Sequence, residues 1–292
     1  MKKNLTELVF ILDKSGSMGY LVNDVVGGFN SMIEKYKEEL EEVYVTTVLF
    51  DEVHRVLHNH ININDIEPIT RKDYYASGCT ALLDAVGRTI NSVGERLYNT
   101  PEEERPEKVI FVINTDGEEN SSREFTRSKV KEMIEHQQTK YSWGFLFLGA
   151  NIDAEREAES IGISRNFAAT FAATADGLVS SYEAINDSVM CMASCDSLCD
   201  SATSVKAILN DKVLDSAKTY TDADTLSSKI DASPLVYNIY NNSITRAISN
   251  ISSDDMSLSG MITLAENNSV DAKAYRSFTD EEVNDLFGIG TE

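Results

Sequence analysis

The segment Val109-Ile110-Phe111-Val112-Ile113-Asn114-Thr115-Asp116-Gly117 is the most informative part of the chain for its fold, because an apolar run leads directly into a polar turn. A run without polar alternation is typical of a strand buried on both faces of a parallel sheet. A second run, Leu8 to Leu12, leads into Asp13-Lys14-Ser15-Gly16-Ser17 in the same way. The two runs predict an open α/β sheet with both polar turns at its carboxyl edge.

Helix and strand patterns alternate over the first two-thirds of the chain. Apolar residues recur at helical spacing over 22–40 and 81–97, and two β-branched runs flank Asp51-Glu52 as in a hairpin. Further expected elements are a helix over 122–138, a strand over 143–148, a helix over 153–160, an edge strand over 167–170 and a helix from 175 to about 199. This order predicts a three-layer, Rossmann-like α/β sandwich with a mostly parallel central sheet over residues 1–199.

Residues 200–292 differ from this part by being rich in Ser, Thr and Asn. A narrow apolar stripe from Ala202 to Ile230 suits packing against another helix. Strand-like patterns follow over 235–240 and 257–264, and Thr279 with Glu282 forms a capping-box signal for a last helix. We expect a small α+β module over 200–292 that serves assembly or partner binding, including association of several copies of the chain.

The charge of the chain restricts its partners. Lys and Arg number 26 against 48 Asp and Glu, so the formal net charge is -22. Such an excess repels phosphate backbones and anionic lipids and attracts cations, so we expect no nucleic-acid partner. No segment approaches the ~20 apolar residues of a membrane span, and the first apolar run is too short for a signal peptide. We expect no membrane insertion and a cytoplasmic location, or association with a virion or other particle.

The four cysteines indicate a reducing compartment. Cys191, Cys195 and Cys199 recur every fourth residue and are predicted to lie along one face of a helix, where disulfide geometry is rare; only Cys79 stands elsewhere. A soft-metal site is the alternative, but no His lies nearby. Packed thiols are the favoured interpretation.

Three polar segments are predicted to meet at the carboxyl edge of the sheet: residues 13–17, 77–80 and 115–117. Their carboxylate and hydroxyl oxygens suit a hard cation, namely Mg²⁺, Mn²⁺ or Ca²⁺. Ser15 and Ser17 can turn to one side of a loop that bends at Gly16. Ligation mainly by neutral hydroxyls leaves a metal electrophilic, so we expect it to bind a carboxylate of another molecule.

Together, Asp13, Ser15, Ser17, Thr80 and Asp116 resemble the metal-ion-dependent adhesion site of von Willebrand factor type A domains, the D-x-S-x-S, T, D set. The resemblance covers roughly residues 5 to 195, including the order of the elements. It implies that Ser15, Ser17 and Thr80 contact Mg²⁺ or a similar ion, that the two aspartates act directly or through water, and that a protein partner presents an Asp or Glu.

Enzymatic alternatives find little support. Haloacid-dehalogenase phosphatases need a second Asp where Ser15 stands, and Ser17 lacks the glycine two positions before it, at position 15, that a nucleophile elbow needs. No phosphate-binding or dinucleotide-binding glycine motif occurs. His58 and His60 could share a strand face and bind a metal, but exposed polar alternation is the favoured interpretation. We therefore expect no enzyme, and a metal-dependent hydrolase is the least favoured hypothesis.

Two non-catalytic functions remain. In the first, the metal site belongs to a binding domain that is attached to a larger bacterial or phage assembly. Residues 200–292 form the attachment, since their composition is similar to that of bacteriophage structural and attachment segments. In the second, the chain is an intracellular adaptor that works with an AAA+ ATPase or a stress-response system. The composition of the tail favours the first.

Overall fold

The computed structural model describes residues 1–150, 152–195 and 200–213. A six-stranded sheet with the order β3-β2-β1-β4-β5-β6 forms its centre. The strands are β1 (Lys2–Asp13), β2 (Glu42–Phe50), β3 (His54–Asn62), β4 (Pro106–Thr115), β5 (Gly144–Ala150) and β6 (Ala168–Phe171). Only the β2–β3 pair is antiparallel, as expected of the predicted hairpin, and the other pairs are parallel. The predicted α/β class is confirmed.

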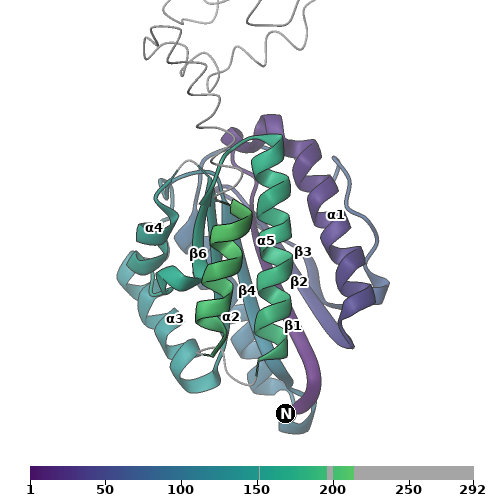
Figure 1. Cartoon of the computed structure of the whole chain (residues 1–292). Helices are drawn as coiled ribbons and strands as arrows, with labels where there is room; N and C mark the ends of the chain where they lie inside the picture. The colour runs from purple at the N-terminus through teal and green to yellow at the C-terminus, as the bar shows by residue number, and fades with distance from the viewer. Residues whose placement is uncertain (151, 196–199, 214–292) are drawn as a thin grey trace, which may run out of the picture. The chain divides into compact units, whose positions relative to one another are not determined.

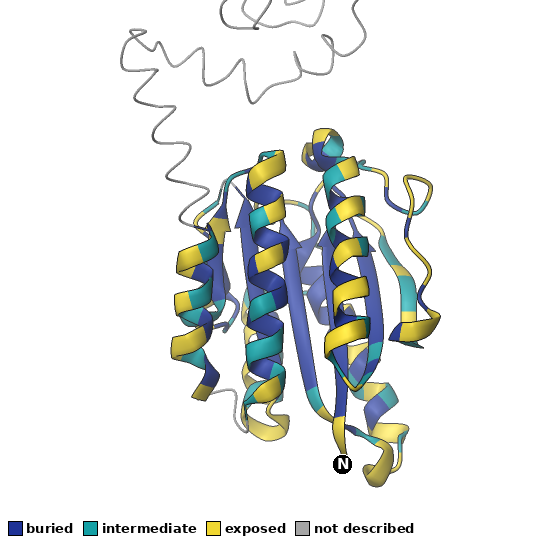
Figure 2. Cartoon of the chain, turned by 45° about the vertical axis from the view of Figure 1, so that its right-hand side comes forward, coloured by how far each residue is buried: buried dark blue, intermediate teal, exposed yellow. Residues whose placement is uncertain are grey.

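Helices cover both faces of the sheet (Figure 1). They are α1 (Val22–Glu39), α2 (Leu82–Asn99), α3 (Arg127–Tyr141), α4 (Ala154–Ser160), α5 (Ala175–Ser194) and a helix over 200–213, with short 3-10 turns η1 (Gly16–Leu21), η2 (Ile63–Asp65), η3 (Glu102–Glu104) and η4 (Arg165–Phe167). One core lies between the sheet and α1, α5 and the 200–213 helix, and a second core lies beneath α2, α3 and α4. The strands are buried between helices whose outer faces are exposed (Figure 2).

Strand β1 shows why the sequences of the central strands are continuous apolar runs. Leu8, Phe10 and Leu12 belong to the first core, whereas Val9 and Ile11 belong to the second. Successive side chains of a strand point to opposite faces, so a strand with a helical layer on each side must be apolar at every position. No helix among the described residues is long and apolar enough to cross a membrane.

Helix α3 begins later than predicted. The expected start was Ser122, but the helix runs from Arg127, and the hydroxyl of Thr126 caps it by accepting the Lys129 N–H. The backbone N–H groups of residues 123–125 instead donate to the carboxylate of Asp84 on α2. A tertiary contact therefore holds this segment as a loop.

Helix α5 ends earlier than predicted, at Ser194 rather than near Cys199. Cys195 is extended, and its carbonyl accepts a hydrogen bond from the Lys108 ammonium on β4. Cys191 lies in the helix while Cys195 lies beyond it, so the prediction that these thiols share one helix face is wrong. Cys199 lies outside the described residues.

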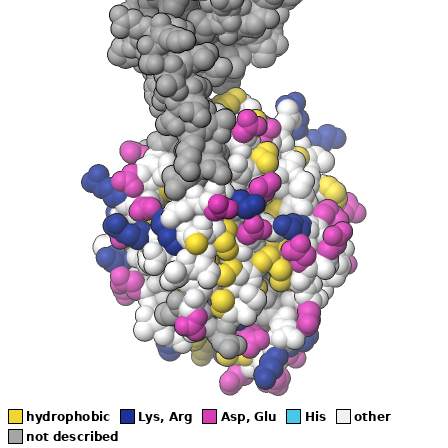
Figure 3. Space-filling view, viewed as in Figure 1, with side chains coloured by type: hydrophobic (Ala, Val, Ile, Leu, Met, Phe, Trp, Pro, Cys, Tyr) yellow, Lys and Arg dark blue, Asp and Glu magenta, His cyan; other side chains and the backbone are white. Residues whose placement is uncertain are grey.

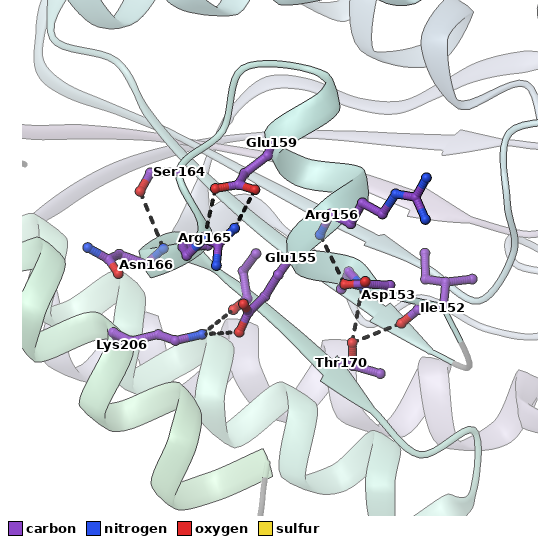
Figure 4. A network of polar contacts seen from close by, with 12 residues as sticks. Ile152, Asp153, Glu155, Arg156, Glu159, Ser164, Arg165, Asn166, Thr170 and Lys206 are labelled. Carbon is purple, nitrogen blue, oxygen red and sulfur yellow. Dashed lines mark hydrogen bonds and ion pairs between the residues drawn. The ribbon is translucent and has the colours of Figure 1, made fainter.

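The helix over 200–213 packs against α5, beside which it lies in Figure 1 (green). Its Val205, Leu209 and Val213 are buried in the same core as α5. At its outer side, the Lys206 ammonium donates to the Glu155 carboxylate of α4 at 2.6 Å and to the Ala168 carbonyl at 3.2 Å (Figure 4). The hydrophobic core therefore extends past residue 199, where the sequence analysis divides the chain; the elements expected over 214–292 lie outside the described residues.

Candidate metal centre

The first and third polar segments meet because β1 and β4 are neighbouring parallel strands. Leu12 pairs with Asn114 in the register, so Asp13 and Thr115 follow at the same level of the sheet. The Thr115 hydroxyl donates to the Asp13 carboxylate at 2.6 Å. The other oxygen of that carboxylate accepts the Ser15 N–H at 2.7 Å. Asp13 thus fixes the loop that follows it, as an aspartate at a turn commonly does.

The predicted donor atoms of these two segments lie within hydrogen-bond distance of one another. The Ser17 hydroxyl donates to Asp116 Oδ1 at 2.7 Å, and the Ser15 hydroxyl reaches the same oxygen at 3.5 Å. The two serine hydroxyl oxygens are 3.1 Å apart. Ser15, Ser17 and Asp116 therefore form one compact cluster of oxygen atoms, drawn from the ends of two strands.

The second segment, residues 77–80, joins this cluster. The Gly16 N–H donates to the Gly78 carbonyl at 3.0 Å. A Cβ added at Gly117 would lie 3.0 Å from Thr80 Oγ1, so the threonine hydroxyl lies directly beside the third segment. Gly78 has a φ of +70°, and a Cβ there would collide with the Glu52 carboxylate, so this turn requires glycine. All five residues predicted from the sequence are thus gathered at one edge of the sheet.

Burial makes the two aspartates unusual. Asp13 is 1% exposed and Asp116 is 8% exposed, whereas Ser17 lies on the surface. Burial raises the pKa of Asp13, even though Thr115 and Ser15 donate to it. Burial, with the nearby charge of Asp13, raises the pKa of Asp116 to about 6. Two poorly solvated carboxylates beside the hydroxyls of Ser15 and Ser17 fit a divalent cation, which would supply the missing positive charge.

An ion pair beneath the loops, which the sequence analysis missed, holds two of the segments together. Lys14 and Asp51 are both buried, and the Lys14 ammonium donates to the Asp51 carboxylate. The Ser77 hydroxyl donates to the same carboxylate at 2.8 Å. Burial opposes ionisation of Asp51, but the bonds from Lys14, Val53 and Ser77 hold its pKa below the usual range. Its place in the predicted hairpin turn gave no signal of this role.

A second set of positioning residues holds Thr80 in place. The Asn120 side chain accepts the Thr80 N–H at 2.9 Å, and the Asn120 N–H donates to the Thr80 carbonyl at 3.0 Å. The Glu119 carboxylate accepts the Leu83 N–H at the start of α2 and the N–H groups of Ser121 and Ser122. Residues 119–122 therefore tie the third segment to the second. No local pattern in the sequence reveals this, because the partners lie about 40 positions apart.

The histidines take no part in the candidate centre. His58 bonds to the Thr47 hydroxyl and stacks on Phe29, while His60 bonds to the Glu7 carboxylate and stacks on Tyr44. The two are half-buried and have partners, so the exposed polar alternation expected for them is wrong. Within residues 1–150, 152–195 and 200–213, no three His, Cys, Asp or Glu side chains are grouped so as to hold a metal. The candidate centre thus depends on hydroxyls.

Comparisons with known proteins give likenesses in structure only. No protein-family model and no curated protein matches the chain. Proximal thread matrix protein 1 from the mussel byssus matches at 14% identity and TM-score 0.45, over 64% of this chain and 46% of that one. A von Willebrand factor type A protein from Catenulispora acidiphila matches at 15% and 0.44, over 63% and 42%. The conserved hypothetical protein BatB from Bacteroides thetaiotaomicron matches at 16% and 0.41, over 65% and 100%.

This chain spans less than half the length of the first two of these structures. At such identities and TM-scores the matches carry no information about activity. The assignment of the fold depends instead on the molecule itself. The strand order is that of a doubly wound sheet with one antiparallel edge strand, and its carboxyl edge gathers Asp13, Ser15, Ser17, Thr80 and Asp116. The part of the chain that the structure describes is a doubly wound α/β domain whose carboxyl edge gathers the five residues that resemble a metal-ion-dependent adhesion site.

Proposed function

We propose that this protein is a non-catalytic, metal-dependent protein-binding protein. One observation carries the proposal: the exposed Ser17 hydroxyl is bonded to the buried, poorly solvated Asp116 carboxylate at 2.7 Å. A cation placed among these oxygens has protein ligands on its inner side and faces solvent at Ser17. Its outer side is therefore open to a ligand from another molecule.

The donor atoms favour a hard divalent cation. Ser15, Ser17 and Thr80 would hold it through hydroxyl oxygens, and Asp13 and Asp116 through carboxylates or intervening water. We propose Mg²⁺ as the resident ion, with Mn²⁺ and Ca²⁺ as substitutes. One form of the mussel byssus protein has a zinc-occupied motif of this type. That observation concerns the mussel protein, and zinc belongs among the ions to be tested here.

The partner we propose is a protein that offers an Asp or Glu side chain. Three neutral hydroxyls leave much of the charge of a divalent ion uncompensated, and an external carboxylate completes the shell. The proposed absence of catalysis is supported by the surroundings. The Lys14 ammonium is committed to Asp51, and the bonds of His54, His58 and His60 go to Thr89, Thr47 and Glu7.

We further propose that the chain beyond residue 213 fixes this domain to a larger bacterial or phage assembly. The composition and patterns of residues 214–292 support this. On the face seen in Figure 3, basic side chains lie among the acidic ones, so this face offers a partner no single charged patch to bind. Binding of the partner's carboxylate to the metal would then supply the specificity that the charge of this surface does not.

Metal binding by the full chain tests the proposal. Mn²⁺ binding followed by electron paramagnetic resonance, and Mg²⁺ binding followed by calorimetry, should be lost in Asp13→Ala and in Asp116→Ala. The exposed Asp65 of η2 provides the matched control, and Asp65→Ala should bind like the wild type. Unchanged metal affinity in both site variants would refute the assignment. Capture of acidic peptides should likewise depend on Mg²⁺ and disappear in EDTA.

A further inference from the structure

A polar pocket adjoins the candidate metal centre and takes no part in it. Its volume is about 520 Å³, and it is lined by Glu52, Asp84, Arg88, Ser121, Arg123 and Glu124. These residues come from the β2–β3 turn, helix α2 and the loop before α3. The pocket thus lies where three segments that position the centre come together.

Two residues that line the pocket, Ser121 and Glu52, contact the segment 78–80 of the metal centre. The Ser121 N–H donates to the Thr80 carbonyl at 3.2 Å. The Glu52 carboxylate lies against the α-carbon of Gly78, whose own carbonyl binds the Gly16 N–H. A ligand that reaches the metal past Thr80 therefore has the pocket beside it.

Most of the charged groups in the pocket are already committed. The Asp84 carboxylate accepts three backbone N–H groups, and Arg88 is paired with Glu124 at 2.6 Å. Among the described residues, no carboxylate lies within ion-pair distance of the Arg123 guanidinium. The Ser121 hydroxyl is buried and has no hydrogen-bond partner. The Ser121 oxygen is enclosed by protein, so the Arg123 guanidinium is the donor left to the pocket, while Glu52 remains on the wall beside Gly78.

We propose that this pocket is a second subsite for the same partner, and that it takes a second carboxylate of that partner. The proposal rests on the proposed function, since the metal is taken to hold the first carboxylate. The Arg123 guanidinium can bind that carboxylate through two parallel N–H bonds. Glu52 disfavours a carboxylate placed away from Arg123 and so restricts its position.

Capped, fluorescently labelled glycine-rich peptides test the subsite on the full chain in Mg²⁺. One peptide carries a single Glu, and the others carry a second Glu one, two or three positions away, with Gln or Lys at that position as comparisons. Anisotropy titrations give the dissociation constants. For the wild type, the best-spaced second Glu should tighten binding about fivefold relative to Gln, because an exposed ion pair contributes little more.

Arg123→Ala should remove that gain and leave the affinity for the single-Glu peptide and for Mn²⁺ unchanged. The bond to Asp84 uses the backbone of Arg123, so the loop should keep its place. Arg156→Ala is the matched control, since Arg156 is exposed on α4 and its side chain extends away from its neighbours in Figure 4. Arg123→Glu should reverse the preference in favour of Lys.

The outcomes are distinct. Equal affinity of the wild type for Glu and Gln peptides, or tighter binding of Lys peptides, would overturn the subsite while leaving the metal-dependent function intact. A gain that persists in Arg123→Ala would overturn it as well. Failure of the single-Glu peptide to bind in Mg²⁺ would count against the proposed function itself, and the subsite would fail with it.

Discussion

The Lys14 ammonium and the Asp51 carboxylate form a buried ion pair that joins the loop after β1 to the loop after β2, with 4% and 5% of the two side chains exposed. Because Ser15 follows Lys14 directly, this pair holds the first polar loop, residues 13–17, in place at the edge of the sheet. The backbone repeats the link, since the Lys14 N–H donates to the Phe50 carbonyl and the Lys14 carbonyl accepts the Ser77 N–H.

Breaking this pair should destabilise the domain strongly. Asp51→Ala leaves a buried ammonium without its partner, which costs about 3–5 kcal/mol in comparable cases. Urea unfolding monitored by circular dichroism measures the change in unfolding free energy. Glu132→Ala is the control, because Glu132 pairs with Lys129 on the surface and should contribute less than about 1 kcal/mol. Equal effects of the two substitutions would contradict a structural role for the buried pair.

Asn120 should act on metal affinity more than on stability. Asn120→Ala removes the acceptor of the Thr80 N–H and so loosens the threonine at the candidate centre. Positioning groups of this kind commonly change metal affinity about 10-fold or more. We expect Mn²⁺ affinity to fall by that order while the urea midpoint changes little. Asn64→Ala, an exposed position on η2, should change neither quantity. Wild-type Mn²⁺ affinity in Asn120→Ala would show that Thr80 does not need this support.

The contribution of Asp84 should depend on pH. Burial opposes its ionisation, but the N–H groups of Arg123, Phe125 and Glu124 outweigh this and hold its pKa below the usual range. A carboxylate with a depressed pKa stabilises the fold above its unfolded pKa of about 3.9, and this contribution is lost as the pH falls through the folded pKa. Asp84→Asn should therefore cost about 1–3 kcal/mol at pH 7.

The deficit of Asp84→Asn relative to the wild type should shrink below about pH 4, where the wild-type carboxylate becomes protonated. Urea midpoints of both proteins across the acid range measure it. A difference in stability that stays constant down to the lowest pH measured would indicate that the shape of the Asp84 side chain, and not its charge, holds residues 123–125.

The central strands were predictable because they are buried on both faces. Ile110, Val112 and Ile113 lie between two helical layers, and nothing but an apolar run fits there. The centre was predictable because its residues directly follow such strands. The start of α3 was not predictable, because Asp84 takes the N–H groups of residues 123–125 from another element. The end of α5 depends likewise on Lys108, a partner far away in sequence.

The positioning residues escaped prediction for the same reason. Lys14 and Asp51 are 37 positions apart, and only the parallel pairing of β1 and β2 brings their turns together. Charged residues in turns are usually solvated, so nothing in the local sequence marked these two as buried. The histidines of β3 illustrate the opposite error, since their alternation resembled a solvated face while Glu7 on β1 and Phe29 on α1 provided partners for them.

The helix over 200–213 should contribute to the stability of the preceding domain. Leu209 is fully buried against the α5 side of the core, and Leu209→Ala should cost about 2–5 kcal/mol in the full chain. Asn210→Ala, at the next and exposed position of the same helix, should cost less than about 0.5 kcal/mol. Thermal or urea unfolding measures both. An unchanged free energy of unfolding in Leu209→Ala would mean that this helix does not stabilise the core against which it packs.

The pairing of β1 with β4 places Ser17 and Asp116 together although 99 residues separate them in the chain. A metal bound between them acts as a removable cross-link, closed only after the central strands have met. It therefore cannot guide the early steps of folding, because its ligands do not yet form a set. The metal instead affects unfolding, because an occupied centre must release its ion before the two strands separate. It should therefore slow unfolding and leave the folding rate unchanged.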